Sequence, residues 1–268
     1  MIQRVLSAIV LIPLVIAAVF LAPPLVFSLV ITLLGTINFY ELLQMARPSW
    51  PAPPPWLPLA GGAVAGFVVS HPVGPEFRGL GVVLFFLCMT CLSVLYSEKV
   101  EEVFGRVVLP VAGFVYIYVF FSFVYEIRFA LVPDRGAWLL IAFLAMQWVG
   151  DTFAFLAGSA FGRHKLRPLL SPKKSVEGTV GGLVGSAAVG AILALAVFPE
   201  RPWWPFAVLG LFMGAFGQLG DLLESQFKRA FGVKDSSRLI PGHGGLLDRM
   251  DSLLLTAPLF YLGLRWVL

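Results

Sequence analysis

The chain has little charge: only 13% of its 268 residues are Asp, Glu, Lys or Arg, about half the ~25% that is usual in soluble domains. A soluble domain of this length could not cover its surface with so few polar side chains. With 59% apolar residues, the chain is also too hydrophobic to be intrinsically disordered. These two exclusions predict a polytopic membrane protein.

Cysteine is almost absent, since Cys88 and Cys91 are the only two in the chain. A single pair does not form a disulfide framework. The C-x-x-C spacing would need further ligands to bind zinc, and the surrounding apolar run contains none. We interpret both cysteines as small residues that pack between helices.

Long apolar runs, separated by charges and by proline or glycine clusters, divide the chain into nine segments of roughly the length that crosses a bilayer. The first run, from Val5 to Tyr40, has no charge and is too long for a cleaved signal peptide, so it is interpreted as two spans. The predicted spans are about 5–22, 25–46, 57–71, 79–97, 107–125, 137–162, 178–198, 203–223 and 247–267.

The basic residues favour one orientation, because cytoplasmic loops carry an excess of Lys and Arg. With the N-terminus in the cytoplasm and the C-terminus outside, 14 of the 19 basic residues lie on the cytoplasmic side. The exceptions are Arg78, Arg128, Arg135, Arg201 and Arg265. Two cytoplasmic loops, 163–177 and 224–249, contain ten of these 14 basic residues. Exactly two spans separate them, so both loops are expected in the same compartment.

Acidic residues lie where a bilayer disfavours them. Glu41, Asp151 and Asp221 fall within predicted spans, and Asp248 and Asp251 begin the last one. A carboxylate at the bilayer centre costs at least ~2.5–3.5 kcal/mol on insertion scales, so such residues are functional candidates. Glu41 is near the end of its span and is interpreted as reaching the interface. Asp248 alone would suit a helix cap, but the other acids exceed what capping requires and favour Mg²⁺.

The two basic loops offer ligands for phosphate. The first contains Ser171, Lys173 and Lys174, without the G-x-x-x-x-G-K-[ST] pattern of a P-loop. In the second, the glycine-rich turn 241–245 leads into a helix N-terminus, where anions are favoured. The alternative is that these basic residues only set the topology or meet anionic lipid headgroups. The pattern favours a cytoplasmic site for metal and polyphosphate and leaves the substrate open.

From Ser225 to Asp251 the chain closely resembles the signature of the phosphatidate cytidylyltransferases, also called CDP-diacylglycerol synthases. The residues that match it are Ser225, Lys228, Arg229, Lys234, Asp235, Ser237, His243, Gly244, Gly245, Asp248, Arg249 and Asp251. Asp151 and the segment 171–174 also resemble the family. One departure is Ser175-Val176, where the family commonly has threonine and often an aromatic residue; serine keeps the hydroxyl.

The resemblance implies an all-α polytopic fold with an N-terminal membrane region, 1–136, and a catalytic membrane region, 137–268. The implied reaction converts CTP and phosphatidic acid to CDP-diacylglycerol and pyrophosphate. Its implied cofactor is Mg²⁺, with a second monovalent or divalent cation as an alternative. The resemblance further implies a homodimer in the bacterial cytoplasmic membrane, with its site facing the cytoplasm and no nucleic-acid partner.

The resemblance and the charge pattern together assign roles to these residues. The expected metal ligands are Asp221, Asp248 and Asp251. The expected catalytic set adds His243, Lys228 and Arg229. The expected substrate contacts are Ser171, Lys173, Lys174, Ser225, Lys234, Asp235, Gly244, Gly245, Arg249 and Asp151.

The sequence leaves two other functions open. A CTP-dependent lipid-alcohol kinase of the polyprenol type would share the membrane character but release CDP instead of pyrophosphate. A cation- or proton-coupled transporter would spread its acids along a path through the bilayer, whereas Asp221, Asp248 and Asp251 are expected at one face beside a basic loop.

Overall fold

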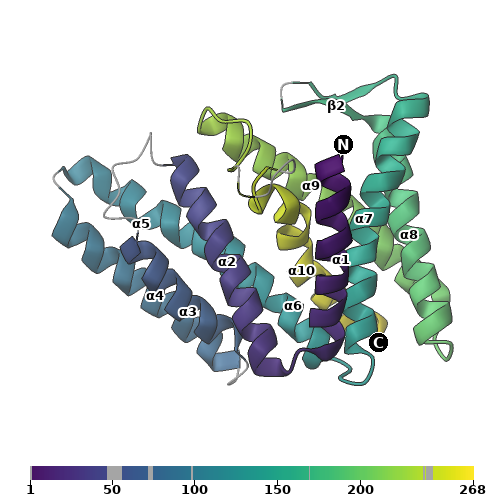
Figure 1. Cartoon of the computed structure of the whole chain (residues 1–268), viewed down its shortest axis with the longest axis horizontal. Coiled ribbons are helices and arrows are strands. Elements are labelled where there is room, and N and C mark those ends of the chain that lie inside the picture. Colours follow the sequence, from purple (N-terminus) through teal and green to yellow (C-terminus); the bar gives the residue numbers. More distant parts are fainter. Residues whose placement is uncertain are drawn as a thin grey trace. The chain divides into compact units, whose positions relative to one another are not determined.

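The structure is a computed structural model that describes residues 2–46, 56–71, 75–97, 99–168, 170–237, 239 and 244–268, nearly all of them helical (Figure 1). Within these described ranges, six helices are long and apolar enough to cross a membrane: Pro24–Ala46, Gly79–Tyr96, Gly105–Phe129, Gly136–Phe161, Val176–Val197 and Trp203–Ala230. The prediction of a helical, multi-pass membrane protein is confirmed at this level. The count of nine spans and their orientation remain predictions.

In order along the chain, the elements are α1 (Ile2–Leu21), α2 (Pro24–Ala46), α3 (Trp56–Ser70), α4 (Pro75–Tyr96), α5 (Val100–Phe114), the π-helix η2 (Val115–Val119), α6 (Phe120–Phe129), α7 (Gly136–Phe161), β1 (Lys165–Arg167), β2 (Ser171–Ser175), α8 (Val176–Val197), α9 (Trp203–Ala230) and α10 (Leu247–Val267). The longest described element is α9, and a segment of 16 residues connects it to α10. The proline-rich connector after the second predicted span lies outside the described residues.

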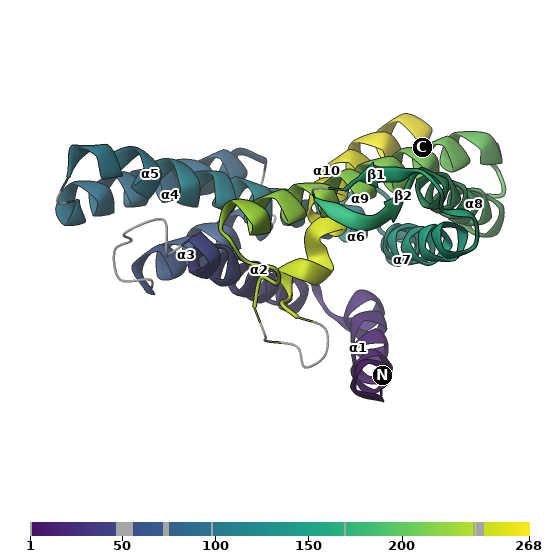
Figure 2. The same cartoon turned by 90° about the horizontal axis from the view of Figure 1, so that it is seen from above.

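The chain forms two compact units. The first contains Met1–Tyr125 and Ala230–Arg249, and the second contains Glu126–Arg229 and Met250–Leu268. In the first unit, α3 packs against α2 and α4, and α4 packs against α5; Figure 2 shows α4 and α5 side by side. The segment between α9 and α10 therefore belongs to the same unit as the N-terminal helices.

An aromatic core holds α2 in the first unit. Tyr118 of η2 is 1% exposed, and its hydroxyl donates to Thr36 Oγ1 at 2.9 Å. The ring of Phe39 lies edge-on to that of Tyr118, with 5.8 Å between the ring centroids. A Cβ on Gly66 would lie 2.2 Å from the Tyr118 ring, so glycine is needed where α3 approaches. This packing fixes the helix that carries Glu41.

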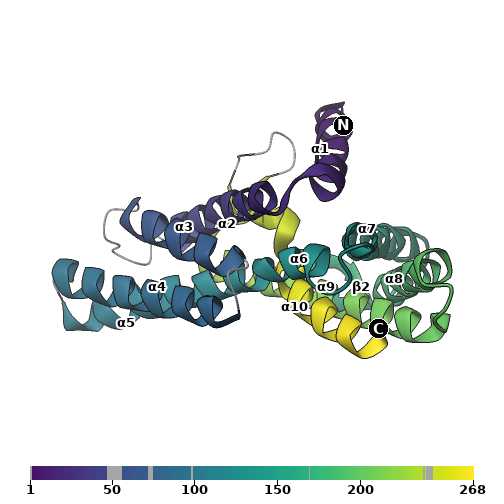
Figure 3. The same ribbon diagram turned by 90° about the horizontal axis from the view of Figure 1, so that it is seen from below.

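Small residues join the helices of the second unit. Figure 3 shows α7 and α8 side by side, and the Ser186 hydroxyl of α8 donates to the backbone oxygen of Met146 at 2.7 Å. A Cβ on Gly150 would lie 2.4 Å from Ser186 Oγ, and one on Gly210 would lie 2.2 Å from the Ser186 backbone oxygen. Close backbone approach at small residues is typical of helices packed within membranes.

The first basic loop is ordered as an antiparallel hairpin, which we did not predict because its strands are short and polar. Lys165 of β1 lies opposite Ser175 of β2. The Ser175 hydroxyl accepts from the backbone N–H of Gly178 at 3.2 Å and caps α8. Glu177 Oε1 lies 2.7 Å from His164 Nδ1 and ties the start of the hairpin to α8. The serine at this position therefore keeps a capping hydroxyl.

Candidate active site

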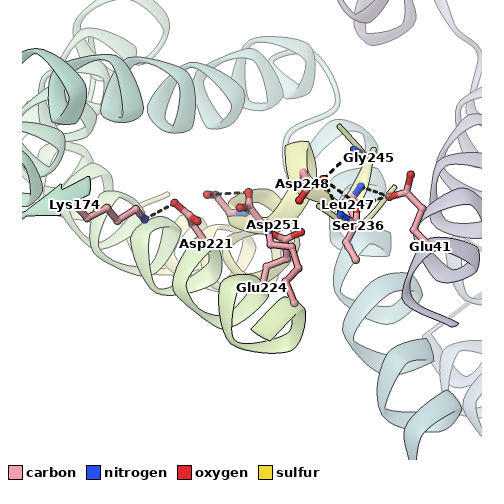
Figure 4. A network of polar contacts seen from close by, with 11 residues as sticks. Glu41, Lys174, Asp221, Glu224, Ser236, Gly245, Leu247, Asp248 and Asp251 are labelled. Atoms are coloured by element: carbon pink, nitrogen blue, oxygen red, sulfur yellow. Dashed lines mark hydrogen bonds and ion pairs between the residues drawn. The ribbon is translucent and has the colours of Figure 1, made fainter. Parts of the chain in front are cut away.

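Acidic side chains from three helices and one lysine gather in the second unit; we call Asp151, Lys174, Asp221 and Asp251 the acidic cluster. Lys174 of β2 forms an ion pair with Asp221 of α9 (Figure 4). The carboxylates of Asp221 and Asp151 repel that of Asp251, and Lys174 attracts it. Residues far apart in the sequence therefore act on one another electrostatically.

Glycine brings two of these acids together. A Cβ on Gly220 would lie 2.7 Å from the backbone oxygen of Asp251 and 3.1 Å from the Cα of Ser252. Without that Cβ, α9 can approach the first turns of α10. Asp221 follows this contact directly in the sequence, so its carboxylate lies beside the turn that carries Asp251. The Asp251 carboxylate itself accepts from the backbone N–H of Ser252 at 2.7 Å.

The acidic cluster is compatible with Mg²⁺ as the charge partner of a bound nucleotide. Within the described ranges, no three Asp, Glu, His or Cys side chains are grouped so that they could hold a metal ion. Mg²⁺ commonly takes only one or two carboxylates and completes its shell with water and substrate phosphates. Asp221 and Asp251 fit that donor set, and a cation beside them would relieve their mutual repulsion.

A second ion pair lies one turn along α9 from Asp221. Glu224 is 0% exposed, and its Oε2 lies 2.7 Å from Lys228 Nζ. The sequence placed Lys228 in the expected catalytic set but did not single out Glu224, which directly follows the predicted end of the span. Its position three residues after Asp221 places both acids on neighbouring parts of one helix face, which is the signal that could have identified it.

Asp248 organises the segment that precedes α10, which we call the signature loop (residues 231–246, of which 231–237, 239 and 244–246 are described). Its Oδ2 accepts from the backbone N–H of Ser236 at 3.0 Å, the Ser236 hydroxyl at 3.0 Å and the backbone N–H of Gly245 at 2.9 Å. These donors precede Asp248 in the chain, so the side chain ties the loop back onto the start of α10. Whether it also binds metal stays a prediction.

The side chain of Glu41, on α2, binds the same loop. It is 1% exposed, so the interpretation that it reaches the membrane interface is wrong. It accepts from the hydroxyls of Ser236 at 2.9 Å and Ser237 at 2.6 Å, and from the backbone N–H groups of Leu246 at 3.0 Å and Leu247 at 2.8 Å. Figure 4 shows Glu41 pointing toward Ser236 and Leu247. The sequence marked Glu41 as an intramembrane acid but did not reveal its partners.

The other predicted site residues are distributed over the hairpin, the end of α9, the signature loop and the start of α10. The exposed ones are Lys173, Arg229, Lys234, Asp235 and Arg249, and the half-buried ones are Ser171 and Ser225. Gly244 has a φ of 85°, which favours glycine. Gly245 also requires glycine, because a Cβ there would lie 1.8 Å from Ser236 Oγ. His243 lies outside the described residues.

Comparison with known proteins gives matches over nearly the whole chain. The cytidylyltransferase family matches residues 2–267. The phosphatidate cytidylyltransferase of Staphylococcus aureus (strain COL) is 35% identical over 236 residues, 88% of this chain and 88% of that protein. The phosphatidate cytidylyltransferase of Staphylococcus saprophyticus is 44% identical over 144 residues, 54% of each chain. In that second match, the chain spans about half the length of its relative.

Proposed function

The chain belongs to the cytidylyltransferase family, and we propose that it transfers the cytidylyl group of CTP to phosphatidic acid. The family resemblance noted in the sequence is confirmed. The substrate pair is supported by the relatives named phosphatidate cytidylyltransferase, one of them similar over 88% of both chains. The observation that carries the proposal is the acidic cluster, in which Lys174 is paired with Asp221 beside other carboxylates.

The reaction needs charge neutralisation more than it needs a base. An oxygen of the lipid phosphate attacks the α-phosphorus of CTP, the bond from that phosphorus to the β-phosphate bridging oxygen breaks, and pyrophosphate leaves. The nucleophile is already anionic at neutral pH, so no side chain has to remove a proton from it. Repulsion between the two anions and the charge that develops on pyrophosphate oppose the reaction, so cationic groups are expected to supply the catalysis.

The chain's basic side chains would bind and orient the phosphates. The residues proposed for this role are Lys173, Lys174, Lys228, Arg229 and Arg249. Lys174 and Lys228 each have a carboxylate partner, Asp221 and Glu224, which holds the ammonium group in place until a phosphate competes for it. His243 would donate to a phosphate oxygen, and Asp151 would support a basic neighbour.

Mg²⁺ is the proposed cofactor, held by Asp221, Asp251 and Asp248. When bound, it would neutralise charge on the CTP phosphates and on the leaving pyrophosphate. Asp221 and Asp251 are the members of this set that lie in the acidic cluster. Asp248 would contribute from one turn earlier on α10, while its Oδ2 continues to hold the signature loop.

The reaction products test the proposal directly. Purified protein in detergent is incubated with labelled CTP and phosphatidic acid, with and without Mg²⁺. We expect CDP-diacylglycerol and pyrophosphate, formed only when Mg²⁺ is present. Release of CDP with a phosphorylated lipid alcohol would instead indicate the kinase, and cation or proton flux in vesicles without nucleotide transfer would indicate the transporter.

The proposed topology has nine spans, an N-terminus in the cytoplasm and the active site facing the cytoplasm, and the proposed assembly is a homodimer in the bacterial cytoplasmic membrane. The distribution of the 19 basic residues supports the orientation. Single cysteines introduced beside Lys173 and Lys234 should react with a membrane-impermeant thiol reagent only from the cytoplasmic side. A cysteine beside Arg135 should react only from outside, and labelling of the first two from opposite sides would contradict the topology.

A further inference from the structure

We infer that Glu41 is a positioning residue for the cytidylyl transfer, acting through the signature loop. The inference rests on the proposed function and extends it, because it gives a role to α2 in the N-terminal half of the chain. Glu41 is 1% exposed, and both of its carboxylate oxygens accept hydrogen bonds from the loop and the start of α10. Its effect must therefore pass through the loop residues that it binds.

The geometry requires a carboxylate at position 41. Each oxygen receives two donors: Oε1 accepts from Ser237 Oγ and the Leu246 N–H, and Oε2 accepts from Ser236 Oγ and the Leu247 N–H. An ionised carboxylate is acceptor-only and has about four lone-pair sites, so it can satisfy all four donors. An amide would turn one end into a donor that faces other donors. The four bonds also compensate the cost of burying the charge.

The contacts couple Glu41 to the start of α10. Leu247 is the first residue of that helix, where backbone N–H groups lack partners within the helix. Glu41 lies 206 residues before Leu247 in the sequence, and its carboxylate caps the N-terminus of α10 in place of a neighbouring side chain. Glu41 therefore sets where α10 begins and how the loop enters it.

The hydroxyl of Ser236 extends this coupling to Asp248. Its Oγ lies 2.9 Å from Glu41 Oε2 and 3.0 Å from Asp248 Oδ2. A hydroxyl has one hydrogen to donate, so two carboxylates share it, and a change at one carboxylate alters the hydrogen bonding of the other. Asp248 is a proposed metal ligand. Glu41 would hence influence the reacting groups without touching them.

The test compares Glu41→Gln and Glu41→Asp with Thr32→Val as the matched control. Thr32 lies on the same helix and is buried, but its hydroxyl donates within α2, to the backbone oxygen of Ser28. We expect Glu41→Gln to lower kcat by about 10- to 100-fold, as is usual for residues that orient catalytic groups. Glu41→Asp keeps the charge and should recover part of the loss, and Thr32→Val should keep the wild-type kcat.

Hydrogen exchange separates positioning from general destabilisation. In Glu41→Gln the amides of Gly245, Leu246 and Leu247 should exchange at least about tenfold faster, because bonds to a charged acceptor are lost. The amides of α3 and α4 should keep their wild-type rates. Faster exchange throughout the first unit would mean that Glu41 only stabilises the fold, and wild-type kcat with unchanged loop exchange would likewise overturn the inference.

A double variant tests the route through Ser236. If Glu41 acts through this hydroxyl, then Ser236→Ala should lower kcat, and Glu41→Gln combined with Ser236→Ala should cost less than the product of the two single effects. Fully multiplicative effects would rule out that route. If the wild-type protein made no CDP-diacylglycerol, the proposed function would fail, while the exchange measurements would still decide whether Glu41 holds the loop.

Discussion

The carboxylates that bind the signature loop and those of the acidic cluster are satisfied in different ways. Glu41 and Asp248 accept hydrogen bonds from neutral hydroxyl and N–H groups, which hold them in one geometry without a ligand. Asp221 is balanced by the ammonium of Lys174, and Asp251 is repelled by its acidic neighbours. The neutral donors hold Glu41 and Asp248 in place, whereas the paired charges of Asp221 and Lys174 can exchange partners when phosphate and metal bind.

The largest effect is expected from substitutions in the acidic cluster, which would test whether its carboxylates bind metal. Asp221→Asn and Asp251→Asn should each stay folded yet lose cytidylyl transfer by at least about two orders of magnitude, ~3 kcal/mol of barrier, because asparagine is a poorer ligand for Mg²⁺. The measurement is kcat at a series of Mg²⁺ concentrations, with thermal unfolding as the check on folding.

Asp248→Asn tests whether Asp248 binds metal or only holds the signature loop, because an amide oxygen could still accept from the three donors that bind Oδ2. We expect it to lose activity like the other two variants. A silent Asp248→Asn would leave Asp248 as a tie for the loop, with Asp221 and Asp251 as the remaining ligands. Unchanged rates in all three variants would refute the metal assignment.

A smaller effect is expected at the lysines of the hairpin. Lys173→Ala combined with Lys174→Ala should raise the KM for CTP or lower kcat by about tenfold or more, since a hydrogen bond to a charged group contributes ~1.5–3 kcal/mol. Lys174→Ala should account for more of the loss than Lys173→Ala, because Lys174 is held by Asp221. Steady-state kinetics with each variant are the measurement. Normal kinetics in a folded double variant would indicate that both lysines only set the membrane topology or meet lipid headgroups.

The smallest effect is expected at an exposed ion pair, where charges contribute little. Arg135 binds Glu200 at the surface of the second unit, and this hydrogen bond is the main reason why the pKa of Glu200 lies below its usual 4.5. A lowered pKa in the folded state means that the pair stabilises the protein above pH 4.5 and loses that contribution as the pH falls toward the folded-state pKa.

Glu200→Gln should therefore lower the Tm only slightly at pH 7, and the difference from wild type should shrink below pH 4.5. Thermal unfolding of both proteins across this range is the measurement. A difference that stays constant with pH would show that the ionised carboxylate is not its cause.

The candidate site was partly readable from the sequence because part of it is encoded in local spacing. Asp248 and Asp251 share a helix at i and i+3, and the basic residues of both loops were visible as a pattern against a chain with little charge. The hairpin was not readable, since its short polar strands lack alternation. Glu224 was missed because the predicted span ended at residue 223, directly before it, whereas α9 continues to Ala230.

The sequence by itself determined the membrane class, the positions of the apolar helices and the motif that matches the cytidylyltransferases. Those features depend on composition and spacing along short stretches of chain, which folding does not alter. Only the tertiary structure decided that Glu41 binds a loop 195 residues away and that Lys174 pairs with Asp221. Such partners are chosen by how helices pack, where glycines such as Gly66 and Gly220 allow close approach, and no local pattern in α2 or β2 specifies them.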